Sequence, residues 1–179
     1  ADLPQGIYYV NVQSEDCTMT SVEIRITEPT PLEVVPTITD ISCNGAADGS
    51  IALNVQGGTG NYQFAISPNL NQFDDSATFT GLDSGSYQVI AQDENGCFEV
   101  ISFDITEPAE LQMTYTATPE ICVGDEDGTI ALTITGGTAP YSASLNSNND
   151  SDYVQDRTTF DNLASDTYVV FVKDANGCT

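Results

Sequence analysis

The sequence predicts an all-β protein made of tandem immunoglobulin-like β-sandwich modules of about 80 residues each. Three observations lead to this fold class. Apolar and polar residues alternate in short β-branched runs, as at 51–55 and 130–134. Turn residues separate these runs every eight to twelve positions. Long stretches of sequence also recur at a fixed offset, whereas no segment has the apolar spacing of a helix.

The recurrence defines the modules. Residues 43–53, Cys-Asn-Gly-Ala-Ala-Asp-Gly-Ser-Ile-Ala-Leu, return at 122–132, an offset of 79 (122 − 43), and Ile-Thr-Glu-Pro at 26–29 returns at 105–108. A period of this length is typical of arrays that serve as surfaces, spacers or adhesins. We therefore expect a window of a longer array with three parts. These are the C-terminal part of a preceding repeat (1–29), a complete repeat (30–108) and a repeat lacking its last strand (109–179).

Turn signals order the strands within each module. Gly57-Gly58 and its counterpart Gly136-Gly137 end one strand, because glycine adopts backbone angles that other residues avoid. Asn-Gly at 95–96 and 176–177 favours a tight hairpin. Leu-x-x-Gly-x-Tyr at 82–87 resembles a tyrosine corner. We expect seven short strands per module, with loops near 66–76 and 144–157. Ile-Thr-Glu-Pro falls at the seams, where proline favours an extended, stiff linker.

Charge excludes several partners. The chain has 3 basic and 27 acidic residues, for a formal net charge of −24. Nucleic acid is excluded because its phosphates require cations, and an anionic membrane surface is equally unfavourable. No apolar run approaches the roughly 20 residues needed to cross a bilayer, so direct membrane insertion is not expected. The net negative charge makes the chain repel itself, which keeps an array extended and favours the binding of divalent cations.

Acidic loops are the candidate cation sites. Asp125 and Asp127 precede a strand in an Asp-x-Asp-Gly spacing, and Asp48 is the counterpart in the other module. Asp93 and Asp174 lie in the predicted hairpins. Calcium takes six to eight oxygen ligands from flexible loops, so calcium is the possible cofactor. The alternative interpretation is that these are solvated turn residues, since Asp and Gly favour turns.

The five cysteines indicate disulfides and an oxidising exterior, because no histidine and no Cys-x-x-Cys pair is present for zinc. Taken module by module, Cys43 pairs with Cys97, Cys122 pairs with Cys178, and Cys17 has its partner upstream. A second scheme joins Cys17 to Cys43 and Cys97 to Cys122 across the seams. The sequence cannot establish connectivity. The first scheme is preferred here because the extended seam opposes the second.

Catalysis is not expected. The chain has no histidine, which removes Ser-His-Asp and Cys-His chemistry and most transition-metal sites. No pair of carboxylates stands out in both modules as a glycosidase pair would. Aromatic residues recur at strand positions and are interpreted as core, with a sugar-binding platform as the alternative: Tyr62, Phe64, Phe79, Tyr141 and Phe160.

Taken in order, these motifs resemble the SprB-type repeat of very large cell-surface proteins in gliding and related Bacteroidetes. The residues that carry the resemblance are Cys43, Gly45, Asp48, Gly49, Ser50, Ile51, Gly57, Gly58, Thr59, Tyr62, Leu82, Gly85, Tyr87, Asp93, Asn95, Gly96 and Cys97, followed by Ile-Thr-Glu-Pro at 105–108. The resemblance covers nearly the whole chain.

The resemblance implies a surface adhesin exported by the type IX secretion system and carried by the gliding machinery. It also implies O-glycosylation at Asp-[Ser/Thr]-apolar motifs, and Asp75-Ser76-Ala77 fits, with Ser76 as the acceptor. The expected function is a semi-rigid stalk and adhesive surface outside the cell, whose partners are neighbouring repeats and an extracellular polysaccharide or surface. The alternatives are a carbohydrate-binding array and a self-assembling surface filament.

Overall fold

The structure is a computed structural model that describes residues 3–14 and 17–179, and it confirms the all-β prediction. The described residues form 14 strands and one three-residue 3-10 helix. The strands are β1 (Gly6–Ser14), β2 (Cys17–Ile26), β3 (Glu33–Thr39), β4 (Gly49–Gln56), β5 (Tyr62–Ile66), β6 (Thr78–Leu82), β7 (Gly85–Asp93), β8 (Phe98–Ile105), β9 (Gln112–Thr118), β10 (Gly128–Thr135), β11 (Ser142–Leu145), β12 (Val154–Gln155), β13 (Thr159–Leu163) and β14 (Val170–Lys173), with the helix η1 at Asp150–Asp152.

Contacts divide the chain into two compact units. One comprises residues 1–35, 54–76 and 89–101, and the other comprises 36–53, 77–88 and 102–179. The first unit contains the antiparallel hairpin of β1 and β2, which pairs Gly6 with Ile26. None of the helical residues that the structure describes forms a segment long and apolar enough to span a membrane.

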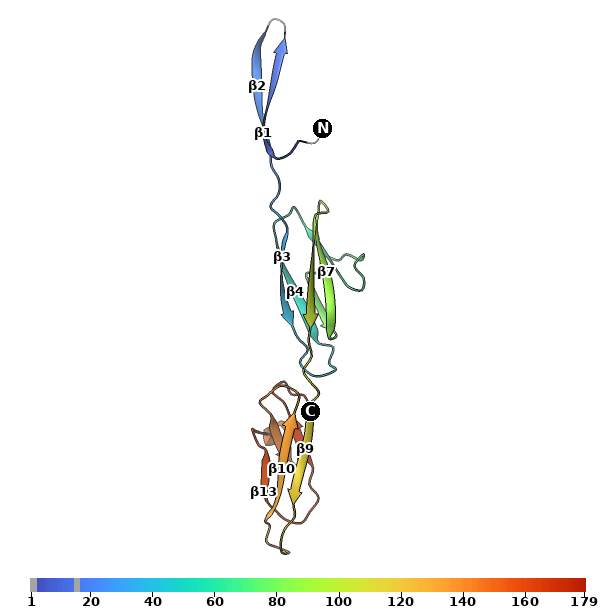
Figure 1. Ribbon diagram of the computed structural model, residues 1–179, viewed down its shortest axis with the longest axis vertical. Helices are drawn as coiled ribbons and strands as arrows, with labels where there is room; N and C mark the ends of the chain where they lie inside the picture. Colours follow the sequence, from blue (N-terminus) through green and yellow to red (C-terminus); the bar gives the residue numbers. More distant parts are fainter. Residues whose placement is uncertain (1–2, 15–16) are drawn as a thin grey trace. The chain divides into compact units, whose positions relative to one another are not determined.

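Each repeat contributes two three-stranded sheets. The first repeat forms sheets with the strand orders β3-β4-β6 and β5-β7-β8, and the second forms β13-β10-β9 and β12-β11-β14. Figure 1 shows β13, β10 and β9 side by side. Six strands per repeat are found instead of seven. In the first repeat an isolated bridge between Phe64 and Asp74 takes the place that β12 has in the second, because only one residue pair is in register there.

The core of the second repeat lies between its two sheets. Ile130 and Leu132 of β10, Ala143 of β11 and Phe160 of β13 are buried together, and partly buried residues of β9 and β14 pack against them. Alternate residues of β10 point inward, as the period of two predicts. The face-to-face packing is that of a β-sandwich. Phe64 and Phe160 are 3% and 2% exposed, which confirms the core interpretation for these two aromatics.

The predicted turns have the expected bonds. The Tyr87 hydroxyl donates to the Asp83 carbonyl at 3.1 Å, and Tyr168 donates to Ala164 at 3.0 Å, so both repeats have a tyrosine corner. At the glycine pair of the second repeat, Gly136 has a φ of 73°. A Cβ there would lie 1.8 Å from the Glu110 carbonyl oxygen, so only glycine fits.

Candidate functional site

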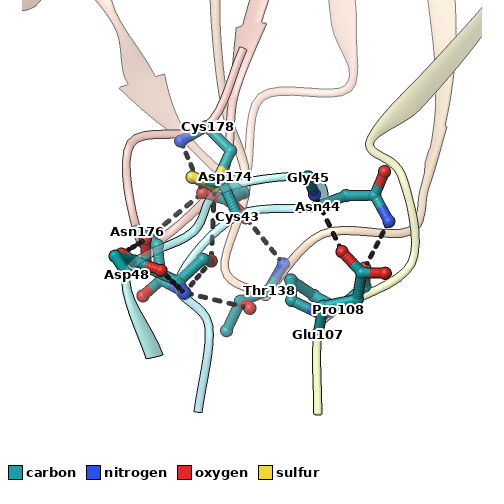
Figure 2. The surroundings of a disulfide bond; sticks show 11 residues. Cys43, Asn44, Gly45, Asp48, Glu107, Pro108, Thr138, Asp174, Asn176 and Cys178 are labelled. Carbon is teal, nitrogen blue, oxygen red and sulfur yellow. Dashed lines mark hydrogen bonds between the residues drawn. A yellow bond between two sulfur atoms is a disulfide. The ribbon is translucent and has the colours of Figure 1, made fainter. Parts of the chain in front are cut away.

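A disulfide between the two repeats is the candidate functional site. Cys43, in the loop after β3, is bonded to Cys178, in the turn after β14. The two Cα atoms are 5.7 Å apart, although 135 positions separate the residues in sequence. Both cysteines belong to the second compact unit. Figure 2 shows the bond and the polar side chains around it.

The loop that carries Cys43 is held by carboxylates. Asp48 accepts hydrogen bonds from the backbone N–H and the hydroxyl of Ser42, which closes the loop at the start of β4. Glu107 of the Ile-Thr-Glu-Pro string accepts from the Gly45 N–H at 2.8 Å. The Asn44 side-chain amide donates to the Pro108 carbonyl at 3.0 Å. The seam and the cysteine loop are therefore hydrogen-bonded to each other.

The turn that carries Cys178 is built around one buried carboxylate. Asp174 is 4% exposed. Its Oδ1 accepts from the N–H groups of Asn176 and Cys178, both at 2.9 Å, and its Oδ2 accepts from the Thr138 N–H at 2.8 Å. Three backbone donors thus satisfy the buried carboxylate, as burial requires. Asp93 makes the same three kinds of bond in the first repeat, to Thr59, Asn95 and Cys97.

A polar contact accompanies the disulfide. The Asn176 side-chain amide donates to the Ser42 carbonyl oxygen at 2.8 Å and to the Thr138 hydroxyl at 3.2 Å (Figure 2). Asn176 therefore bridges the cysteine loop of the first repeat and the Gly-Gly-Thr turn of the second. Sequence reasoning used Asn176 only as a hairpin signal and missed this contact. The recurrence of Asp-x-Asn-Gly-Cys at 93–97 and 174–178 could have pointed to it, because a tight turn alone requires only the Asn-Gly pair.

The predicted cysteine pairing is wrong. Neither Cys43–Cys97 nor Cys122–Cys178 forms, and the alternative scheme across the seams does not form either. The second repeat gives the reason. The loop of Cys122 is bonded to Asp127 at the start of β10, whereas the turn of Cys178 is bonded to Thr138 beyond its end. Eight strand residues span roughly 25 Å. A disulfide needs Cα atoms within about 7 Å, so cysteines at opposite ends of a sandwich cannot pair.

The remaining cysteines occupy equivalent positions. Cys97 stands on its turn as Cys178 does, and Cys122 stands in its loop as Cys43 does. Both are free and exposed. Cys17 begins β2, but its side chain lies outside the described residues, so its partner upstream stays a prediction.

The five candidate calcium ligands are not brought together. Asp93 and Asp174 bind backbone N–H groups inside their turns. Asp48 binds Ser42, and Asp127 accepts from the Ile121 N–H at 2.9 Å. Within 3–14 and 17–179, no three Asp, Glu, Cys or His side chains are grouped as a metal site. Calcium binding, including that by Asp125, stays a prediction. Ser76 is exposed on its loop, and its glycosylation also stays a prediction.

In both cysteine loops, hydrogen bonds from the loop lower the pKa of one carboxyl group. Hydrogen bonds from the side chain and backbone of Ser42 lower the pKa of Asp48. In the second repeat the pKa of Glu120 is lowered, chiefly by the backbone N–H of Glu126, with further donation from the N–H groups of Gly124 and Ser165. Glu120 thereby joins the cysteine loop to the corner loop. Glu107 has this role in the first repeat, where it binds Gly45 and Ser84.

These features define an all-β tandem-repeat chain in which a disulfide joins two consecutive repeats. Residues 35–71 and 114–150 match the model of the SprB repeat, so two segments of the chain are similar to this repeat family. The matches begin 79 residues apart (114 − 35), which is the offset of the sequence repeat, and this confirms the predicted resemblance. SprB repeats form a structural repeat family rather than an enzyme family, and they occur in cell-surface proteins. No curated protein matches the chain.

Proposed function

We propose that the chain is a stalk segment of a secreted bacterial cell-surface adhesin, in which disulfides between repeats carry mechanical load. The Cys43–Cys178 bond carries this proposal, because it joins two repeats in addition to the polypeptide linker. The family supports a surface protein. Adhesion, export by the type IX system and a part in gliding motility belong to the same proposal, and they rest on the family alone.

The bond would change how force passes through the chain. If the chain is pulled at its two ends, the disulfide connects residue 43 directly to residue 178. The residues between them, 44–177, are then removed from the load path. Both sandwiches lie mainly within that span. A stalk built in this way resists extension even when a sandwich unfolds.

Equivalent cysteines would extend the same linkage along an array. Cys122 occupies the position of Cys43, and Cys97 occupies that of Cys178. In a longer chain they would pair with cysteines of neighbouring repeats, which are the expected partners. The net charge of −24 would add repulsion along the stalk and favour extended forms.

Single-molecule stretching of the chain by its ends tests this proposal. The cysteines at 17, 97 and 122 are first changed to serine, so that only the Cys43–Cys178 bond can form. We expect the oxidised chain to lack about 450 Å of the contour length of the reduced chain, since 135 residue steps at roughly 3.3–3.6 Å each are withheld. The matched control adds Cys43→Ser and should behave as the reduced chain under both conditions.

Equal contour lengths for the oxidised and reduced chains would contradict the load-bearing role. Saturable binding of one glycan by the unmodified chain would instead favour the carbohydrate-binding array. That test is independent of the stretching result, because glycan binding does not require the Cys43–Cys178 bond.

A further inference from the structure

Asparagine is followed by glycine at three places in the chain, and two of these pairs flank the Cys43–Cys178 bond. The pairs are Asn44-Gly45, Asn95-Gly96 and Asn176-Gly177. Cys43 directly precedes the first pair, and Cys178 directly follows the third. All three asparagines are exposed, so water reaches each of them. Asparagine is a thermolabile residue, and a following glycine makes it more so because glycine has no side chain to hinder the reaction.

The reaction at such a pair, deamidation, consumes only water. The backbone nitrogen of the glycine loses its proton and attacks the side-chain amide carbon of the asparagine. A C–N bond forms and closes a succinimide ring, while the bond from that carbon to the amide nitrogen breaks and the nitrogen leaves as ammonia with the proton. Water then opens the ring at one of its carbonyl groups. The product is aspartate, or isoaspartate when the main chain runs through the side-chain carbon.

The amide groups that leave in this reaction are hydrogen-bonded on both sides of the disulfide (Figure 2). The Asn176 Nδ2 donates to the Ser42 carbonyl oxygen at 2.8 Å and to the Thr138 hydroxyl at 3.2 Å. The Asn44 Nδ2 donates to the Pro108 carbonyl oxygen at 3.0 Å. These three bonds and the disulfide form a junction between the cysteine loop, the seam and the turn of Cys178. Turning either amide carbon toward the following backbone nitrogen moves its Nδ2 and breaks these bonds.

The attacking nitrogens are hydrogen-bonded as well. The Gly45 N–H donates to the Glu107 carboxylate at 2.8 Å, and the Gly177 N–H donates to the Asp174 carbonyl oxygen at 3.1 Å. Both reacting groups of each pair therefore have partners in the folded chain. The reaction at either pair requires the junction to open locally first.

The third pair is an internal reference. The Asn95 N–H donates to the Asp93 carboxylate at 3.0 Å, as the Asn176 N–H does to Asp174 at 2.9 Å, and the Gly96 N–H donates to the Asp93 carbonyl oxygen at 3.0 Å. Among the residues that the structure describes, none accepts a hydrogen bond from the Asn95 side-chain amide. The two turns thus share their backbone bonds and differ in the contacts of this amide.

We propose that Asn44 and Asn176 are deamidation sites whose reaction is controlled by the junction. While the junction is closed, its hydrogen bonds protect both amides. Once it opens, each amide is available for hydrolysis, and the product is a carboxylate that accepts hydrogen bonds but donates none. Beside the carbonyl oxygens of Ser42 and Pro108, a carboxylate repels where the amide was bonded. Deamidation therefore records an opening of the junction and weakens its closure afterwards.

Peptide mapping by mass spectrometry at mildly alkaline pH measures the reaction at each asparagine. The cysteines at 17, 97 and 122 are changed to serine, so that only the Cys43–Cys178 bond can form. The rate in the folded, oxidised chain is compared with that in the reduced chain in urea, and their ratio gives the protection of each residue. We expect Asn176 to be protected on the order of 10- to 100-fold more than Asn95, because its amide has two further hydrogen bonds. Protection at Asn176 no greater than that at Asn95 would overturn the proposal.

Variants that open the junction test its control of the reaction. A chain with Cys43→Ser and Thr138→Val lacks the disulfide and one acceptor of the Asn176 amide. Its protection at Asn176 should fall to that of Asn95, which should itself be unchanged. Glu107→Ala frees the Gly45 N–H and should lower the protection of Asn44 instead. Unchanged protection at Asn176 in the first variant would contradict control by the junction.

Asn176→Asp carries one of the two products and tests the consequence of the reaction. After reduction, its Cys43–Cys178 bond should re-form on the order of 10-fold more slowly in air, because the bonds that bring the loop to the turn are lost. Asn95→Asp makes the same change of charge on the equivalent turn and should re-form the bond at the unchanged rate. Equal rates for the two chains would refute the predicted effect on closure.

Discussion

Replacing Asp174 should unfold the turn that presents Cys178 to the disulfide. In the Asp174→Ala chain, three backbone N–H groups lose their acceptor in a nearly buried site. Each unsatisfied donor costs about 1–3 kcal/mol. Because water can enter the opened turn, we expect the free energy of unfolding to fall by about 3–5 kcal/mol.

Asp174→Asn gives a graded second measurement. Its remaining carbonyl oxygen can keep the two bonds that Oδ1 accepts from Asn176 and Cys178, while the amide group that replaces Oδ2 faces the Thr138 N–H as a second donor. One bond is lost instead of three, so we expect a loss of about 1–2 kcal/mol. Asp161→Ala, at an exposed position of β13, is the control and should change stability by less than about 0.5 kcal/mol.

Urea unfolding followed by circular dichroism measures these losses, and hydrogen-exchange mass spectrometry assigns them to the second repeat. Exchange at Thr138, Asn176 and Cys178 should accelerate first in Asp174→Ala. The yield of the Cys43–Cys178 bond after air oxidation should fall in the same order as stability. Equal losses for the alanine and asparagine chains, or losses below about 0.5 kcal/mol for both, would refute the role assigned to this carboxylate.

Three further changes test other parts of the second repeat. Gly136→Ala should lower the free energy of unfolding by about 2–4 kcal/mol, since the added Cβ would lie 1.8 Å from a backbone oxygen. Gly124→Ala, with open space around it, is the control and should lower it by about 1 kcal/mol, as measured by thermal melting. Folding lowers the pKa of Glu120, so the stability that its carboxylate contributes is present above its ordinary pKa near 4.5 and is lost as the pH falls through its folded pKa. In a plot of the free energy of unfolding against pH, Glu120→Gln should therefore flatten the decline on the acid side. An unchanged decline would contradict this role of Glu120. Tyr168→Phe removes the corner hydrogen bond and should lower stability by about 1 kcal/mol, while Tyr115→Phe on the exposed face should have no measurable effect.

Local features of the fold were predictable because short-range physics produces them. The alternation at 51–55 and 130–134 places every second side chain in the core, as observed in β4 and β10. Glycine is required at 136 and 137 because both residues have a positive φ, a local conformation that other residues avoid. The tyrosine corners join residues only four positions apart. Each of these depends on neighbours in sequence, so the pattern of residues was sufficient.

The roles of the carboxylates were only partly predictable. Asp93 lies at the turn between β7 and β8 and Asp174 in the turn after β14, but their use as acceptors for three N–H groups depends on the Thr59 and Thr138 turns. Those turns lie 34 and 36 positions away in sequence. A carboxylate in an acidic loop has the same sequence signature whether it binds a cation or the backbone, so the pattern alone left both interpretations open.

The sequence by itself determined that this chain is a β-array with two segments similar to the SprB repeat, because the period, the turns and the strand alternation are local and recur. Only the tertiary structure decided which cysteines meet. Sandwich strands separate the two cysteines of one repeat by their full length, and the seam at Pro108 brings the loop of Cys43 to the turn of Cys178. Disulfide pairing depends on distance in space, and a linear pattern does not contain that distance.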